Sequence, residues 1–117
     1  MVKEYRFEIP DIHPSLNSYI KKHWSVYQYH KQIWNKMVWG IVKQAKIPLI
    51  QSPVEIHIDY FGPKKIDLDN LVPKLILDSL KEIVILDDNP DILKKISWTF
   101  TKHQNKRSVV LIKEINK

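Results

Sequence analysis

Four aspartates in two groups are the residues of this sequence best suited to chemistry. Asp67 and Asp69 flank Leu68, and the doublet Asp87-Asp88 follows some twenty residues later. In an extended segment, the carboxylates of Asp67 and Asp69 point to the same side of the chain. Carboxylate oxygens are the ligands that Mg²⁺ and Mn²⁺ prefer, and a bound ion can activate water and offset charge on a phosphoryl transition state. The spacing therefore predicts a metal site that hydrolyses phosphate esters.

These aspartates belong to an acidic segment of a basic chain. Residues 67–91 contain seven acidic and two basic residues, whereas the other 92 residues contain six acidic and seventeen basic ones, and the whole chain has a net charge of +6. Clustered carboxylates repel one another unless a cation or a special role offsets the cost. An acidic pocket in a basic body suits a metal-dependent enzyme that acts on a polyanion, and nucleic acid is the leading partner.

Aspartates with this spacing also occur in ordinary loops, in EF-hands and in phosphatases. A single Asp-x-Asp triplet is most often a loop or a helix cap. An EF-hand would need a ligand at Leu71 and a glycine at Val72, and neither is present. A haloacid-dehalogenase phosphatase would need an apolar strand running directly into Asp67, whereas residues 62–65 are Gly-Pro-Lys-Lys. The doublet and the charge contrast favour the metal site over these alternatives.

Composition sets the class of protein. The chain has 117 residues, 44% of them hydrophobic, and no cysteine, which excludes disulfides and thiolate metal sites and fits a reducing compartment. No apolar run reaches the roughly 18–20 residues of a membrane span, and the charged amino terminus has no signal-peptide pattern. We therefore expect a cytoplasmic protein with one domain, residues 1–117, and no membrane contact.

The apolar residues recur with two different periods. Alternation predicts strands over residues 5–9, 54–60, 96–101 and 109–115, the last two as a hairpin. Helical spacing predicts a helix over residues 25–46 and a second one from Pro73 to residue 83 or 84. Trp34 and Trp98 fall on apolar faces, in the core or in a dimer interface. The order β-α-β-α-β-β predicts a small α+β domain with a mixed β-sheet packed against two helices.

Taken together, these residues resemble the RusA family of Holliday junction resolvases, small endonucleases of bacteria and phages. The matching motif is Asp67-Leu-Asp69-Asn70-Leu71, then Lys74, then Leu77-Asp78-Ser79-Leu80, then Asp87-Asp88-Asn89. Pro14-Ser15-Leu16-Asn17 followed by His23-Trp24 is similar to the amino-terminal signature of the family. Length and element order agree across essentially the whole chain. Two differences are the inserted Pro73, which places Lys74 one residue later, and Ile66 where the best-known members have arginine.

The resemblance implies a homodimeric, Mg²⁺-dependent endodeoxyribonuclease that resolves four-way DNA junctions by paired phosphodiester hydrolysis, in recombination and repair. Mn²⁺ would be a substitute for Mg²⁺, and no small-molecule cofactor would be needed. The implied metal-binding catalytic acids are Asp67, Asp69 and Asp88, with Asp87 as a support and Lys74 at the scissile phosphate. The implied DNA contacts are Lys64, Lys65, Asn70 and Asn17. A two-fold dimer suits a junction, because the junction presents two equivalent strands.

A function of another class remains open on the same residues. The chain could be a non-catalytic, basic DNA-binding protein whose acids only cap a helix and solvate a turn. Cleavage of a four-way junction in Mg²⁺ separates the two functions. Salt-dependent DNA binding does not separate them, because both would contact phosphates.

Overall fold

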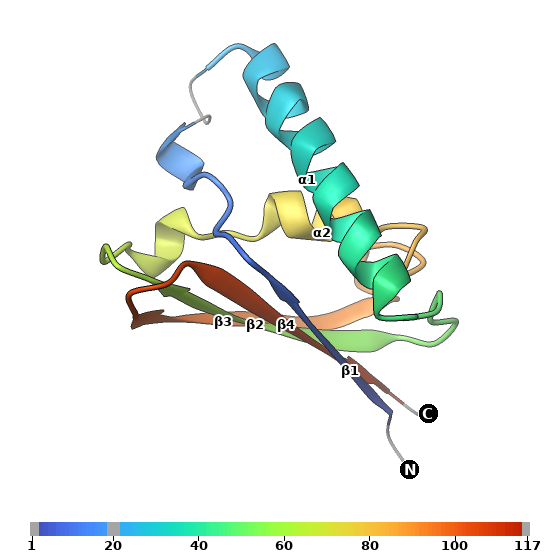
Figure 1. Ribbon diagram of the computed structural model, residues 1–117. Helices are drawn as coiled ribbons and strands as arrows, with labels where there is room; N and C mark the ends of the chain where they lie inside the picture. The colour runs from blue at the N-terminus through green and yellow to red at the C-terminus, as the bar shows by residue number, and fades with distance from the viewer. Residues whose placement is uncertain (1–2, 19–21, 116–117) are drawn as a thin grey trace.

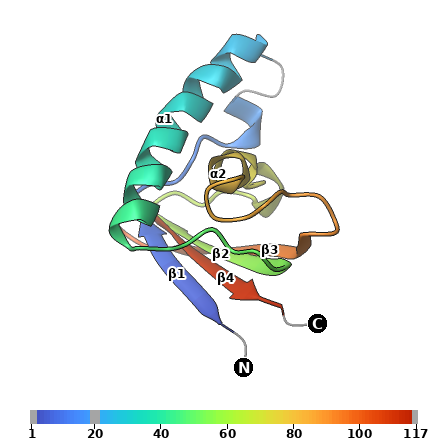
Figure 2. The same cartoon turned by 90° about the vertical axis from the view of Figure 1, so that its right-hand side faces the viewer.

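Two helices lie on one face of a four-stranded sheet in the computed structural model, which describes residues 3–18 and 22–115 (Figure 1). The elements in chain order are β1 (Glu4–Ile9), the 3-10 helix η1 (Leu16–Ser18), α1 (Trp24–Gln44), β2 (Val54–Gly62), the 3-10 helix η2 (Leu68–Asn70), α2 (Lys74–Leu80), β3 (Leu93–Lys102) and β4 (Arg107–Glu114). Figure 2 shows α1 over the β1 side of the sheet and α2 over the β2 and β3 side. The predicted α+β class and element order are confirmed.

The sheet has the strand order β1-β4-β2-β3, with β2 parallel to β3 and β4 antiparallel to both of its neighbours. The prediction that the last two strands form a hairpin is therefore wrong. Burial explains the difference, because Val110 and Ile112 of β4 lie beside Ile58 and Ile56 of β2, and all four are almost fully buried. β4 takes a central position, and β3 becomes an edge strand beside β2.

The alternation of β2 shows that the sheet has one face covered by the helices and one open face. Its buried residues alternate with half-buried ones along the whole strand. Ile58 faces the helices, next to Val110 of β4 and Trp98 of β3, while His57 and Asp59 point to the open face. The buried apolar side chains of the strands and both helices form one continuous core.

The long helix α1 packs through a narrow apolar stripe. Trp34, Val38 and Val42 are its buried residues, at spacings of four along one face. The helix begins after His23, whose Nδ1 accepts a hydrogen bond from the backbone N–H of Ser25 at 3.2 Å. Trp34 therefore belongs to the core, as one of the two alternatives from the sequence had it.

The second helix is shorter than predicted. α2 starts right after Pro73, as expected, but it ends at Leu80 rather than at residue 83 or 84. Lys81 leaves helical geometry and Glu82 has a positive φ of 66°. The β-branched residues that follow have low helix propensity, and Ile85 instead pairs with Ile50 in an isolated bridge. The chain leaves the helix after Leu80, and this early turn allows Val84 and Ile85 to be fully buried.

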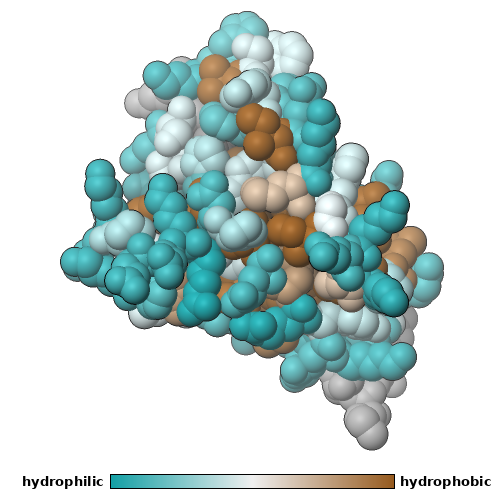
Figure 3. All heavy atoms as spheres, viewed as in Figure 1, coloured by the Kyte–Doolittle hydropathy of each residue, from teal (hydrophilic) through white to brown (hydrophobic). Residues whose placement is uncertain are grey.

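The face seen in Figure 3 is mostly hydrophilic, with apolar side chains exposed only in small patches between polar ones. Within residues 3–18 and 22–115, no helix is long and apolar enough to cross a membrane.

Candidate functional site

The first pair of predicted acids lies on η2. Asp67 is the N-cap residue of this 3-10 helix and Asp69 is inside it, so the segment is not extended and the expected same-side arrangement does not apply. Both residues are exposed. Among the described residues, neither carboxylate accepts a hydrogen bond or forms an ion pair. These are free oxygen donors at the surface, which is the state in which a carboxylate can take a cation from solvent.

The second pair lies in the loop after α2, where Asp87 stabilises a turn. Its Oδ1 accepts a hydrogen bond from the backbone N–H of Asp88 at 2.7 Å, and its Oδ2 accepts one from the Asn89 side chain at 3.1 Å. These hydrogen bonds, with the nearby charge of Lys81, hold the pKa of Asp87 below its ordinary value. Asp87 therefore stabilises the turn, which is the role expected if the doublet is purely structural.

Asp88 is part of a chain of alternating charges along α2. Lys81 Nζ lies 3.2 Å from Asp88 Oδ1 and 3.7 Å from Asp78 Oδ1, and Lys74 Nζ lies 3.9 Å from Asp78 Oδ2. The hydrogen bond to Asp88 raises the pKa of Lys81, so its ammonium stays charged. Asp88 is thus held by a protein cation.

Tyr27 of α1 completes this cluster from the other helix. Its hydroxyl donates to Asp78 Oδ2, and Lys74 Nζ lies 5.6 Å from the centre of the Tyr27 ring. Neither Tyr27 nor Lys81 was predicted from the sequence. The i,i+3 spacing of Asp78 and Lys81 was a signal for Lys81, whereas nothing in the sequence connects Tyr27 to Asp78. Lys74, expected at the scissile phosphate, also forms an i,i+4 ion pair with Asp78.

The structure keeps the two acidic pairs separate. Over the described ranges 3–18 and 22–115, no three His, Asp or Glu side chains lie close enough to share a metal ion. The donor chemistry of Asp67, Asp69 and Asp88 fits a hard cation, but their arrangement is not a preformed cage. Two of them are free, and the third is paired with Lys81.

The predicted DNA contacts lie around η2. Lys64 and Lys65 line a cavity of about 420 Å³ together with Lys106, from the turn between β3 and β4. Ile66, directly before Asp67, is also in its wall, so the lysines and the free carboxylates are neighbours along the chain. η1, which contains Asn17, contacts η2, which contains Asn70. The structure therefore brings the two predicted asparagine segments together, although they are more than fifty residues apart.

A buried histidine joins this cavity to the acidic segment. His13 is 2% exposed and packs edge-on against Trp34 and Tyr60. Its Nδ1 lies 2.9 Å from Pro14 O, its Nε2 lies 2.6 Å from Tyr60 Oη, and Tyr60 Oη lies 3.0 Å from Leu71 O, just after η2. Burial lowers the pKa of His13, and the hydrogen bond to Pro14 offsets this only in part.

The lowered pKa of His13 predicts a pH dependence of stability. Its unfolded value of about 6.5 exceeds the folded one, so the unfolded chain binds the proton first as pH falls. The free energy of unfolding should therefore decrease from pH 7 downwards, until the pH reaches the folded pKa. Urea denaturation of wild type and His13→Gln at a series of pH values measures this. A wild-type profile as flat as that of the variant would contradict it.

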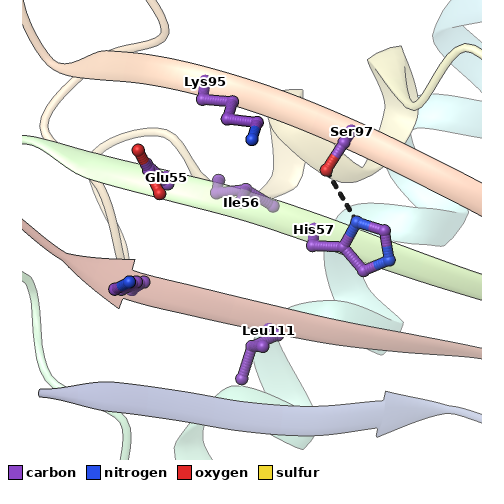
Figure 4. A pocket seen from close by; sticks show the side chains of 7 residues that line it. Glu55, Ile56, His57, Lys95, Ser97 and Leu111 are labelled. Atoms are coloured by element: carbon purple, nitrogen blue, oxygen red, sulfur yellow. Dashed lines mark hydrogen bonds between the residues drawn. The ribbon is translucent and has the colours of Figure 1, made fainter.

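The open face of the sheet has a second cavity, of about 240 Å³, lined by Glu55, Ile56, His57, Lys95, Ser97, Leu111 and Lys113 (Figure 4). His57 Nδ1 lies 2.6 Å from Ser97 Oγ, and His57 Nε2 lies 2.7 Å from Asp59 Oδ1, which also accepts from Thr99. Burial raises the pKa of Asp59, but these hydrogen bonds outweigh it and the pKa is lowered. The polar groups thus satisfy one another across β2 and β3 and stabilise that strand pair.

No protein-family model and no curated protein matches this chain.

Proposed function

We propose that this protein is a Mg²⁺-dependent, structure-specific endodeoxyribonuclease of the RusA type, which resolves four-way DNA junctions as a homodimer. One observation supports this most: the free, exposed carboxylates of Asp67 and Asp69 directly follow a cavity lined by three lysines. The lysines can hold phosphates of a DNA strand, and the carboxylates can hold a cation beside them. The DNA strand and the metal ion that promotes its hydrolysis would then be bound next to each other.

Asp67, Asp69 and Asp88 would hold the metal ion, with Asp87 fixing the turn beside Asp88. When bound, Mg²⁺ supplies an activated water and offsets charge on the phosphoryl group. The lysines of the cavity would position the strand, and Lys74, exposed at the start of α2, would face the phosphate. The Lys81 ammonium, 3.2 Å from Asp88 Oδ1, would compete with a metal ion for that oxygen.

Incubation of the purified protein with an end-labelled synthetic four-way junction tests the proposal. We expect paired incisions in Mg²⁺ or Mn²⁺, and no cutting in EDTA. A linear duplex with the same sequence is the matched control and should stay intact. Binding of the junction with no cutting in either metal would overturn the enzymatic function.

The second candidate, a non-catalytic basic DNA-binding protein, is favoured by a specific observation. Asp87 and Asp88 are both used inside the protein, one in a turn and one in an ion pair. In that case Asp69→Asn would leave the stability of the protein unchanged and would modestly raise its affinity for DNA.

The Lys81–Asp88 pair predicts an altered metal requirement. Lys81→Gln removes the cation that competes with Mg²⁺ for Asp88, so half-maximal cleavage should need less Mg²⁺, by several-fold. A magnesium titration of junction cleavage measures this. Lys94→Gln, which removes an exposed lysine of β3, is the control for loss of charge and should keep the wild-type requirement. A higher Mg²⁺ requirement in Lys81→Gln would mean that Asp88 does not bind the metal.

A further inference from the structure

The lysine-lined cavity is built by three loops from distant parts of the sequence. Its wall consists of residues 12–14, residues 62–66 and Lys106. Three lysines line it, and no acidic residue of the described ranges does. The acids next to the wall in the sequence, Asp11 and Asp67, are both exposed, and Asp11 Oδ1 accepts from the backbone N–H of Ile12. The cavity therefore suits an anionic group with an apolar neighbour.

The hydrogen bonds of His13 cannot all form on a neutral ring. Pro14 O only accepts, so Nδ1 must have a proton. Leu71 O also only accepts, so the bond from Tyr60 uses the hydroxyl proton, and Tyr60 Oη must then accept from Nε2–H. All three bonds together require the imidazolium. With a neutral ring the Tyr60 hydroxyl donates to Nε2, and its bond to Leu71 O is lost.

The buried position of His13 favours the neutral ring in the free protein. The groups packed on it are the uncharged rings of Trp34 and Tyr60, and the charges that border the same cavity are the lysine ammonium groups. Burial disfavours an imidazolium, and the hydrogen bond to Pro14 offsets this only in part. A phosphodiester in the cavity would place a negative charge next to His13 and reverse this balance.

We propose that this cavity binds a phosphodiester of a DNA strand, and that binding is coupled to uptake of one proton from solvent by His13 Nε2. The Tyr60 hydroxyl then turns to Leu71 O and fixes the end of η2, which contains Asp69. The coupling is reciprocal: lower pH strengthens binding by the same free energy with which binding favours protonation. The inference takes its ligand from the proposed function, but it involves no cleavage.

Proton uptake is measured directly by calorimetric titration of a short oligothymidylate into the protein without metal. Diester phosphates do not titrate near neutral pH, so differences in heat between buffers of different ionisation enthalpy report protons taken up by the protein. At about pH 6.5, where histidine responds most, we expect a substantial fraction of one proton per chain. The His13 ring resonances, assigned through contacts with Trp34, should show a higher pKa in the complex. No uptake together with an unchanged ring pKa would overturn the proposal.

Variants locate the site. Lys106→Ala should weaken binding several-fold and reduce the salt slope of the affinity by about one. Lys102→Ala removes the same charge from the end of β3, outside the cavity wall, and should have a clearly smaller effect. His13→Gln should bind with no proton uptake; if it does not fold, the wild-type titrations decide. Equal effects of the two lysine variants would refute the cavity as the site. Failure here leaves junction cleavage as a separate question, and absence of cleavage leaves this binding intact.

Discussion

Replacing Asp69 by asparagine should reduce cleavage of a four-way junction about a hundredfold or more, because a lost metal ligand removes several kcal/mol of transition-state stabilisation. DNA binding should be kept or strengthened, since a negative charge near the phosphates is removed. Stability should not change, because the Asp69 carboxylate is exposed and has no partner among the described residues. Single-turnover cleavage, gel-shift binding and urea denaturation of one preparation measure the three quantities.

Asp91→Asn is the matched control for this variant. Asp91 belongs to the same acidic segment and is exposed, and it has no role in the proposed site. Its variant should cut like wild type. Asp88→Asn should also lose cutting, but in addition it removes an ion pair with Lys81 and so changes two interactions. Wild-type cutting by Asp69→Asn would exclude η2 from the active site.

Trp34→Ala should lower the free energy of unfolding by about 3–5 kcal/mol, the usual cost of removing a large buried side chain. Trp34 is 4% exposed in the middle of α1, and its ring packs edge-on against His13 at a centroid distance of 5.8 Å. Its loss leaves a cavity between α1 and the sheet. It also removes one of the two rings that pack against His13. Urea denaturation monitored by circular dichroism measures the change.

Trp24→Ala serves as the comparison, since Trp24 is 68% exposed at the start of the same helix. It should change stability by no more than about 0.5 kcal/mol. If the two variants cost the same, Trp34 would not be a core residue of the folded protein in solution.

Much of the fold was predictable because apolar periodicity reports burial directly. The alternation in β2 and the i,i+4 stripe of α1 were sufficient to place both elements. Strand pairing was not predictable in the same way. A short polar turn after β3 suggested a hairpin, but pairing depends on long-range contacts, and β2 lies between β3 and β4.

The candidate site was predictable only in part. The sequence located the acids and the lysines, since charge contrast is visible without a structure. It did not reveal that Asp88 is paired with Lys81, or that Tyr27 donates to Asp78 from another helix. It also gave no signal for His13, whose partner Tyr60 is 47 positions away in the numbering. Long-range contacts between polar groups have no periodicity that a sequence pattern can detect.

The central place of β4 constrains how this chain can fold during synthesis. Among the described strands, β1 pairs only with β4. The first strand to be synthesised therefore cannot pair until the last one has been synthesised. β2 and β3 can pair earlier, because both are made before β4 and contact each other directly. Until residues 107–114 leave the ribosome, β2 exposes one unpaired edge and β1 has no partner. A nascent chain stalled before Arg107 would therefore be prone to aggregation.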